Sequence, residues 1–172
     1  MKLSKPPAIS LSSKIAELSK LNILSLVLVA TFLGFYLGSN GEIEYNKLLL
    51  TLLGTALTAA GSGSLNHYLE RDADKKMDRT RNRPLPSGTL TPLFAVLYGM
   101  ALVVIGSVTL AYFVNLLTGF LSLLTAFLYI VVYTPLKKIT WLNTSIGSIP
   151  GAIPIIGGWT ACLLYTSDAA DE

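Results

Sequence analysis

The chain has 172 residues, of which 52% are hydrophobic and 13% charged, and its formal net charge is +3. An average soluble domain carries about a quarter charged residues, so this composition excludes a soluble globular domain and a disordered chain. The single cysteine, Cys162, excludes an intrachain disulfide and a cysteine-based metal site. The sequence therefore predicts an all-α, polytopic membrane protein.

Four long stretches without Lys, Arg, Asp or Glu alternate with clusters of charge. These stretches cover residues 21–41, 48–69, 84–136 and 139–167. A membrane span needs about 20 apolar residues, so the third stretch holds two spans and each of the others holds one. We predict five spans, near residues 22–39, 47–66, 90–112, 115–134 and 144–165.

The basic residues are distributed unevenly between the two sides of the predicted bundle. If the spans alternate, 12 of the 13 basic residues fall on one side, and only Lys47 falls on the other. Cytoplasmic loops carry such an excess, so we expect the N-terminus in the cytoplasm and the protein in a bacterial inner membrane. Before the first span, residues 11–21 have apolar side chains at helical spacing, which predicts a short interfacial helix.

Two of the predicted spans have unusual compositions. The second is crowded with Gly, Ala and Ser between residues 54 and 64, and such small residues let helix backbones approach closely in lipid. The fifth contains Pro150 and Pro154. Proline is tolerated in a spanning helix where neighbours satisfy the freed carbonyl groups, often beside a cavity.

Polar side chains at a constant spacing follow the second span. On a continuing helix, Asn66, Glu70, Asp74 and Asp78 are each four residues apart, and Asp72 falls nearly opposite them. Each step rises roughly 6 Å and turns about 400°, so the four side chains form one stripe from membrane depth to the cytoplasmic surface. Carboxylates this close repel each other unless a cation lies between them, and Mg²⁺ binds one or two carboxylates together with phosphate oxygens.

Three arginines come directly after this stripe: Arg79, Arg81 and Arg83. Guanidinium groups suit phosphate oxygens, so the segment predicts a Mg²⁺–diphosphate site at the membrane surface. The alternative is a solvated run of charge that only sets topology. The depth of Asn66 favours a site. A calcium-binding EF-hand is excluded, because Lys76 and Met77 stand where an oxygen ligand and a glycine are needed.

The run NHYLERDADKKMDRTRNRPLPSG, residues 66–88, resembles the first acidic motif of the UbiA-type intramembrane prenyltransferases. It is most similar to their protoheme IX farnesyltransferase (heme O synthase) branch. A second block resembles another segment of that branch: YTPLK at residues 133–137, with Asn143, Gly147, Pro150, Gly151, Ala152 and Pro154. His67 and Glu70 stand where many members of the wider superfamily have Asp, which favours the heme branch over the quinone branch.

The resemblance implies that residues 1–161 are the N-terminal part of a single intramembrane prenyltransferase domain. Such an enzyme transfers a farnesyl group from farnesyl diphosphate to a vinyl group of heme b, giving heme O for the biogenesis of heme A/O cytochrome oxidases. The implied cofactor is Mg²⁺, held through the diphosphate. The implied partners are the two substrates, the lipid bilayer and, further, a second copy or a heme A synthase, with no nucleic acid.

The resemblance also implies roles for individual residues. The implied catalytic residues are Asn66, Glu70, Asp74 and Tyr133. The implied metal ligands are Asn66, Glu70, Asp74 and, more weakly, Asp78, and the implied diphosphate contacts are Arg79, Arg83 and Lys137. Each has an alternative: Lys137 as a topology signal, and Tyr133 as an interfacial aromatic. The single histidine, His67, is either a heme-iron ligand or a hydrogen-bonded polar residue.

Alternative functions stay open at this point. The acceptor could be a quinone precursor or a chlorophyll-type molecule, and the protein could instead be a transporter with an acidic ion site or a non-catalytic membrane subunit. Similar enzymes have about nine helices and a second acidic motif, so we expect this chain to be an inactive N-terminal part. Residues 162–172 resemble the translation of a sequencing adapter, and we expect the native segment to end near Ala161. The alternative is a short acidic tail.

Overall fold

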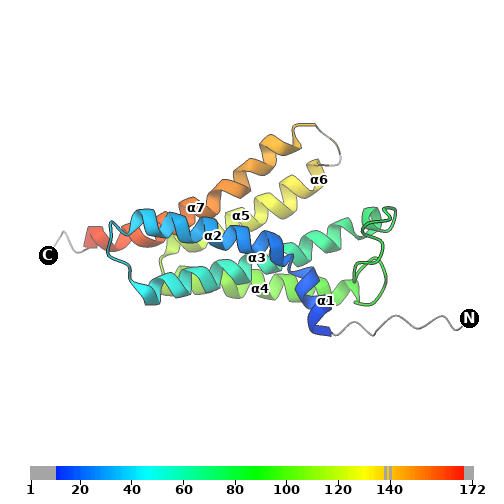
Figure 1. Ribbon diagram of the computed structural model, residues 1–172, viewed down its shortest axis with the longest axis horizontal. Coiled ribbons are helices and arrows are strands. Elements are labelled where there is room, and N and C mark those ends of the chain that lie inside the picture. The colour runs from blue at the N-terminus through cyan, green and yellow to red at the C-terminus, as the bar shows by residue number, and fades with distance from the viewer. Residues whose placement is uncertain (1–10, 138, 140, 169–172) are drawn as a thin grey trace, which may run out of the picture.

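The computed structural model describes residues 11–137, 139 and 141–168, and every regular element within them is helical. The elements form an elongated bundle (Figure 1), which confirms the predicted all-α fold class. In chain order they are α1 (Leu11–Leu18), α2 (Leu21–Gly38), α3 (Tyr45–Asp74), α4 (Pro92–Phe113), α5 (Leu116–Phe127), the π-helix η1 (Leu128–Tyr133), α6 (Thr134–Leu136) and α7 (Asn143–Asp168).

Four helical segments of the described chain are long and apolar enough to cross a membrane. They are Leu21–Gly38, Tyr45–Asp74, Pro92–Phe113 and Leu116–Leu136, which match the first four predicted spans. The fifth predicted span is helical too, as α7, although it is not one of those four. The helix α7 continues through Pro150 and Pro154 and past Cys162, while residues 169–172 of the predicted tail lie outside the described residues.

Small residues let the helices pack closely, as their composition predicts. The helix α3 packs most extensively against α4: a Cβ atom added at Gly61 would lie 2.5 Å from the carbonyl oxygen of Gly99. The helix α2 packs most extensively against α7, where the backbone of Ile155 occupies the space that a side chain at Gly34 would need. Close backbone contact of this kind replaces the hydrophobic driving force that lipid removes.

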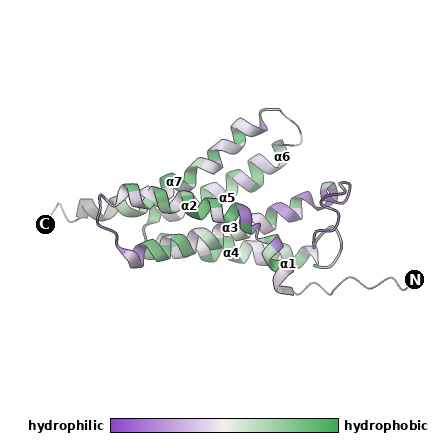
Figure 2. Cartoon of the chain, in the orientation of Figure 1, coloured by the Kyte–Doolittle hydropathy of each residue, from purple (hydrophilic) through white to green (hydrophobic). Residues whose placement is uncertain are grey.

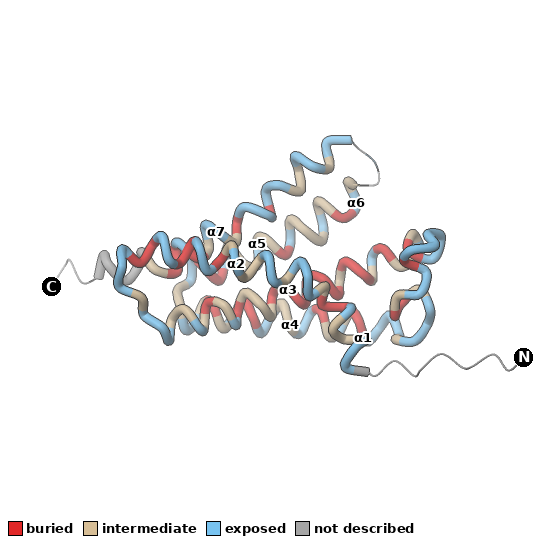
Figure 3. Tube along the Cα trace, viewed as in Figure 1, coloured by how far each residue is buried: buried red, intermediate tan, exposed pale blue. Residues whose placement is uncertain are grey.

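The burial pattern is that of a membrane bundle. Figure 3 shows buried residues running along α3, and the most buried side chains include Thr51, Ser64 and Asn66. Large apolar side chains instead lie on the outside, for example Leu26 on α2 and Val108 on α4. A surface of this kind faces lipid, and small and polar residues fill the contacts between helices.

One end of the bundle is strongly polar. Figure 2 shows hydrophilic residues gathered in the segment that links α3 to α4. The short helix α1 meets the rest of the molecule towards the same end, as the predicted interfacial helix, and Lys20 joins it to α2 with a left-handed backbone (φ 50°). This turn brings the side chain of Lys20 into contact with Asn66 of α3, where the polar stripe begins.

Candidate functional site

The C-terminal part of α3 carries three buried polar side chains at four-residue spacing, besides the buried His67. Asn66 is 0% exposed, and Glu70 and Asp74 are each 6% exposed. Their four-residue spacing places them on one face of a continuous helix, as predicted. A buried carboxylate is costly unless it is paired, and here the partners come from three other parts of the chain.

Asn66 is fixed from two sides. Its side-chain nitrogen donates a hydrogen bond to Thr134 Oγ1 at 2.9 Å, and its side-chain oxygen accepts one from the ammonium group of Lys20. Thr134 in turn donates to the carbonyl oxygen of Tyr129 at 2.7 Å. These contacts connect the ends of α2, α3 and α6 through one amide group.

Each carboxylate of α3 is neutralised by a cation. Glu70 forms an ion pair with Lys137, which follows α6. Asp74 Oδ2 lies 2.9 Å from Arg83 Nη1, in the segment that folds back after α3. The structure thus brings together Asn66, Glu70, Asp74, Arg83 and Lys137, all of which the sequence assigns to the site.

The prediction that Asp78 extends the stripe is wrong, because α3 ends at Asp74. The hydroxyl group of Thr80 donates a hydrogen bond to the carbonyl oxygen of Asp74 at 2.9 Å, where the chain leaves the helix. The side chain of Asp78 is 94% exposed and lies 3.1 Å from Arg81. Arg79 is exposed in the same turn, so neither Asp78 nor Arg79 lies with the buried side chains.

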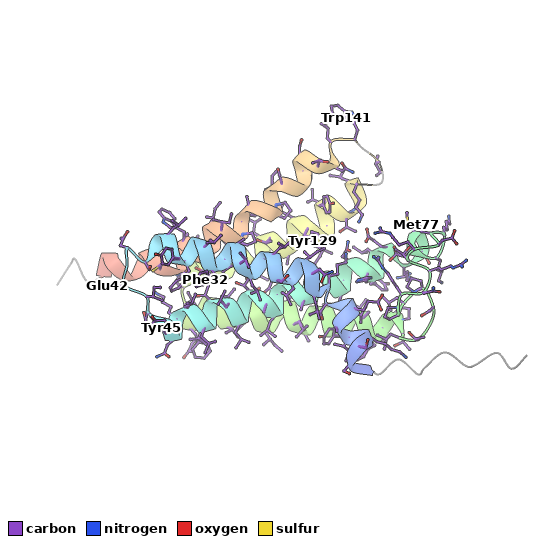
Figure 4. All side chains as sticks on the ribbon, in the orientation of Figure 1. Phe32, Glu42, Tyr45, Met77, Tyr129 and Trp141 are labelled. Atoms are coloured by element: carbon purple, nitrogen blue, oxygen red, sulfur yellow. The ribbon has the colours of Figure 1, made fainter. Side chains whose placement is uncertain are left out.

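Two tyrosines close the site on the side of η1. The rings of Tyr129 and Tyr133 stack with their centroids 5.7 Å apart, and Lys137 Nζ lies 5.7 Å from the centroid of the Tyr133 ring. Figure 4 shows Tyr129 in the middle of the bundle, among the helices. Pro135 has no N–H to donate to the preceding turn. The widened π-helical turn η1 ends two residues before Pro135. Turns of this kind are frequent at functional sites.

Lys20, Thr134 and Tyr129 are site residues that sequence reasoning missed. The ammonium group of Lys20 is 3.5 Å from Tyr129 Oη as well as in contact with Asn66. Burial lowers the pKa of Lys20 to about 8; Glu70 opposes this change, and Lys137 adds to it. Lys20 lies at the end of the predicted interfacial helix, residues 11–21, directly before the first span, and this position is the signal that could have identified it.

His67 lies next to Asn66 but does not face the site's open space. Its side chain is 2% exposed, and neither ring nitrogen has a hydrogen-bond partner among the described residues. It is not among the residues that line the cavity described below. The position gives a bound heme no access to the ring, so it does not favour the heme-ligand interpretation.

A cavity of about 560 Å³ opens from the polar cluster into the bundle. Lys20, Tyr129 and Tyr133 line its polar end, and Leu110 and Thr118 line the opposite end. The walls come from α2, α3, α5 and α7 and are mainly small or apolar. The cavity therefore combines a polar end, which adjoins the charged cluster through Lys20 and is called the mouth below, with an apolar interior.

The donor set fits a metal that is shared with phosphate oxygens. Among the described residues no group of three His, Cys, Asp or Glu side chains could hold a metal ion alone. Glu70 and Asp74 do provide two carboxylates, and Mg²⁺ commonly uses one or two together with substrate phosphates. The three cations Lys20, Arg83 and Lys137 against these two carboxylates leave a net charge of +1, which suits an anionic ligand.

Solved structures with the same fold are intramembrane prenyltransferases. A digeranylgeranylglyceryl phosphate synthase matches 87% of this chain, with a TM-score of 0.76 and 22% identity, over 53% of its own length. A UbiA homologue from Archaeoglobus fulgidus, solved bound to GPP and Mg²⁺, matches 88% of this chain with a TM-score of 0.70 and 22% identity, over 53% of its own length.

Curated relatives are more similar in sequence. A protoheme IX farnesyltransferase from Salinibacter ruber is 49% identical over 84% of this chain and 51% of its own length. The mitochondrial human enzyme of that name is 43% identical over 86% of this chain and 33% of its own length. The chain thus spans about half the length of the Salinibacter ruber relative and about a third of the length of the human one. The UbiA prenyltransferase family matches residues 27–169. This chain belongs to the UbiA prenyltransferase family.

Proposed function

We propose that this chain forms the diphosphate-binding part of an enzyme that transfers a farnesyl group from farnesyl diphosphate to a vinyl group of heme b, giving heme O. The observation that carries the proposal is an apolar cavity of about 560 Å³ whose polar end contains Lys20, which contacts Asn66 of the charged cluster. A diphosphate ester with an isoprenoid chain has the same two-part chemistry. The names of the relatives at 41–49% identity support heme as the acceptor.

The reaction breaks the bond between the first farnesyl carbon and the diphosphate oxygen. The electron pair leaves with the diphosphate, and the π electrons of the vinyl group then form the new bond to the allylic carbon. The cation that this leaves on the other vinyl carbon takes up water and loses a proton, so the vinyl group becomes a hydroxyl-bearing side chain. Groups that stabilise the leaving anion accelerate this step. In this proposal Lys20, Arg83 and Lys137 contact the diphosphate oxygens, and the ring face of Tyr133 stabilises the allylic cation.

The ion pairs of the site exchange partners when the diphosphate binds. Its oxygens compete for Arg83 and Lys137, which frees the carboxylates of Asp74 and Glu70. Bound Mg²⁺ supplies charge that stabilises the leaving group, and Asn66, Glu70 and Asp74 are the residues that would hold it. Asn66 also keeps the start of α2 and the end of η1 in register around the reacting carbon, through Lys20 and Thr134.

An assay on the complete reading frame that contains this chain tests the proposal. Membranes that carry it should convert heme b and farnesyl diphosphate to heme O only with Mg²⁺. Asp74→Asn should lower the rate roughly a hundredfold, the usual effect of losing one such electrostatic group. The matched control is Asp72→Asn, because Asp72 lies two residues away with its side chain exposed, and it should stay within twofold.

Two results would contradict the proposal. If Asp72→Asn and Asp74→Asn reduced the rate equally, the buried carboxylate would have no special role. If the membranes released diphosphate without making heme O, heme would be the wrong acceptor. Product identification by mass spectrometry distinguishes the second result from a loss of all activity.

A further inference from the structure

The cavity has a closed end, which two pairs of helices build. On one side Leu110 of α4, 1% exposed, packs onto α3: a Cβ atom added at Gly54 would lie 2.6 Å from Leu110 Cγ. On the other side the hydroxyl groups of Thr118 and Thr160 are 3.3 Å apart and connect α5 to α7. Leu110 and Thr118 both line the cavity, so they form its floor.

The distance from mouth to floor is set by the helices that form the walls. The residues of α3 that line the cavity extend down to Thr55, eleven residues before Asn66, which is roughly 16 Å along the helix axis. At the roughly 1.2 Å per bond of an extended chain, the twelve in-line carbons of a farnesyl group span roughly 13 Å, and the sixteen of a geranylgeranyl group span roughly 18 Å. An extended farnesyl chain therefore fits within this depth, whereas an extended geranylgeranyl chain exceeds it by roughly 2 Å.

Gly157 lies one turn above the floor and keeps the deep end open. Its carbonyl oxygen accepts a hydrogen bond from Thr160 Oγ1 at 3.1 Å, and it lines the cavity. A Cβ atom added at Gly157 would meet nothing within 4 Å. The neighbouring Gly158 is different, because a Cβ atom there would lie 2.8 Å from Phe35 N in the contact with α2. Gly158 thus allows α7 to pack closely against α2, and the missing side chain at Gly157 leaves space in the cavity.

We propose that Leu110 and Gly157 determine the length of the prenyl chain that the site accepts. The inference rests on the proposed function, because the chain enters the cavity from a diphosphate held at the mouth. A side chain at position 157 fills the space of the last isoprene unit, whereas a smaller side chain at position 110 opens the floor towards Gly54. The two positions should therefore shift the preferred length in opposite directions.

Binding measurements on the protein from the complete reading frame that contains this chain, in lipid nanodiscs with Mg²⁺, test the inference. The ligands are inorganic diphosphate and the dimethylallyl, geranyl, farnesyl and geranylgeranyl diphosphates. Gly157→Leu should weaken farnesyl diphosphate binding at least tenfold, since it prevents burial of several apolar carbons, and leave dimethylallyl diphosphate within twofold. Leu110→Ala should strengthen geranylgeranyl relative to farnesyl diphosphate severalfold. Comparing variants for one ligand cancels its partition into lipid.

Two control variants distinguish an effect on the deep end of the cavity from a general effect on ligand binding. Val108→Ala removes apolar volume from the exposed face of α4, two residues from Leu110, and should leave the order of ligands unchanged. Gly151→Leu also enters open cavity space, but nearer the mouth, and should weaken every ligand that carries a prenyl chain. If Gly157→Leu and Gly151→Leu weakened the same ligands to the same extent, the proposed role of Gly157 in determining chain length would be wrong.

A second measurement does not depend on variants. A farnesyl diphosphate analogue with a photoreactive group at its last isoprene unit should label peptides that contain Leu110 or Thr118. Labelling confined to other peptides would overturn the inference. If the wild-type chain bound neither inorganic diphosphate nor any prenyl diphosphate, the proposed function would fail. Binding of all ligands with an unchanged length preference in both floor variants would overturn only the chain-length inference.

Discussion

A single buried amide connects three helices at the mouth of the site. Asn66 has no exposed surface, and its two polar atoms are shared between Thr134 and Lys20. A buried donor that loses its partner keeps the full cost of having left water, about 1–3 kcal/mol. The stability that this cluster contributes therefore depends on each hydrogen-bond partner of Asn66 being present.

Replacing Thr134 tests this dependence. Thr134→Val keeps the shape but leaves the Asn66 side-chain nitrogen without its acceptor, and should lower the free energy of unfolding by about 1–3 kcal/mol. Thr134→Ser retains the hydroxyl group and should cost less. Thermal unfolding of the purified chain in one detergent compares the two variants. Equal losses would mean that the lost hydrogen bond is not the cause.

The ion pairs of the site predict that Mg²⁺ binds only weakly without diphosphate. Lys137 and Arg83 neutralise Glu70 and Asp74, so a free cation must displace them and meets a net positive charge. The preformed Mg²⁺–diphosphate complex should bind at least tenfold more tightly than Mg²⁺ alone, because its oxygens provide new partners for both cations. Calorimetric titration of the chain with each measures the difference, and equal affinities would contradict the exchange of partners.

Among the elements, the pair α3–α4 depends most on glycine. A Cβ atom added at Gly106 would lie 2.6 Å from the carbonyl oxygen of Gly54, so Gly106→Val must push the two helices apart and should cost about 1–3 kcal/mol of stability. Gly151→Ala is the matched control, since a Cβ atom there meets nothing within 4 Å. Thermal unfolding should show a clear loss for Gly106→Val and almost none for the control.

Helix periodicity predicted the elements well and the end of α3 poorly. The spacing of Asn66, Glu70 and Asp74 is a property of one helix, so it could be read from the sequence. The end of α3 is set by a hydrogen bond from Thr80, a residue six positions away, and spacing alone cannot distinguish this from a helix that continues to Asp78. No local pattern indicates the backbone turn at Lys20, which depends on contacts made 46 residues further along the chain.

At the scale of the whole molecule, the polar mouth and the apolar interior follow from one arrangement of alternating helices. The helices α3 and α5 end at the mouth, whereas α2 and α7 begin there, so cations and carboxylates from distant parts of the chain meet. The same alternation collects most basic residues at this end, and the charge asymmetry predicts that this end faces the cytoplasm. A charged diphosphate would then reach the site without crossing the membrane.

Cysteine labelling tests this orientation. Figure 4 shows Met77 and Glu42 at opposite ends of the molecule, and both are exposed. In a Cys162→Ser background, a membrane-impermeant maleimide should label Glu42→Cys in right-side-out vesicles and Met77→Cys in inverted vesicles. The basic residues near Met77 resist translocation, because moving cationic loops across the membrane is unfavourable. The reverse pattern would place the mouth outside the cytoplasm, and labelling of both positions from one side would contradict the alternating arrangement of the helices.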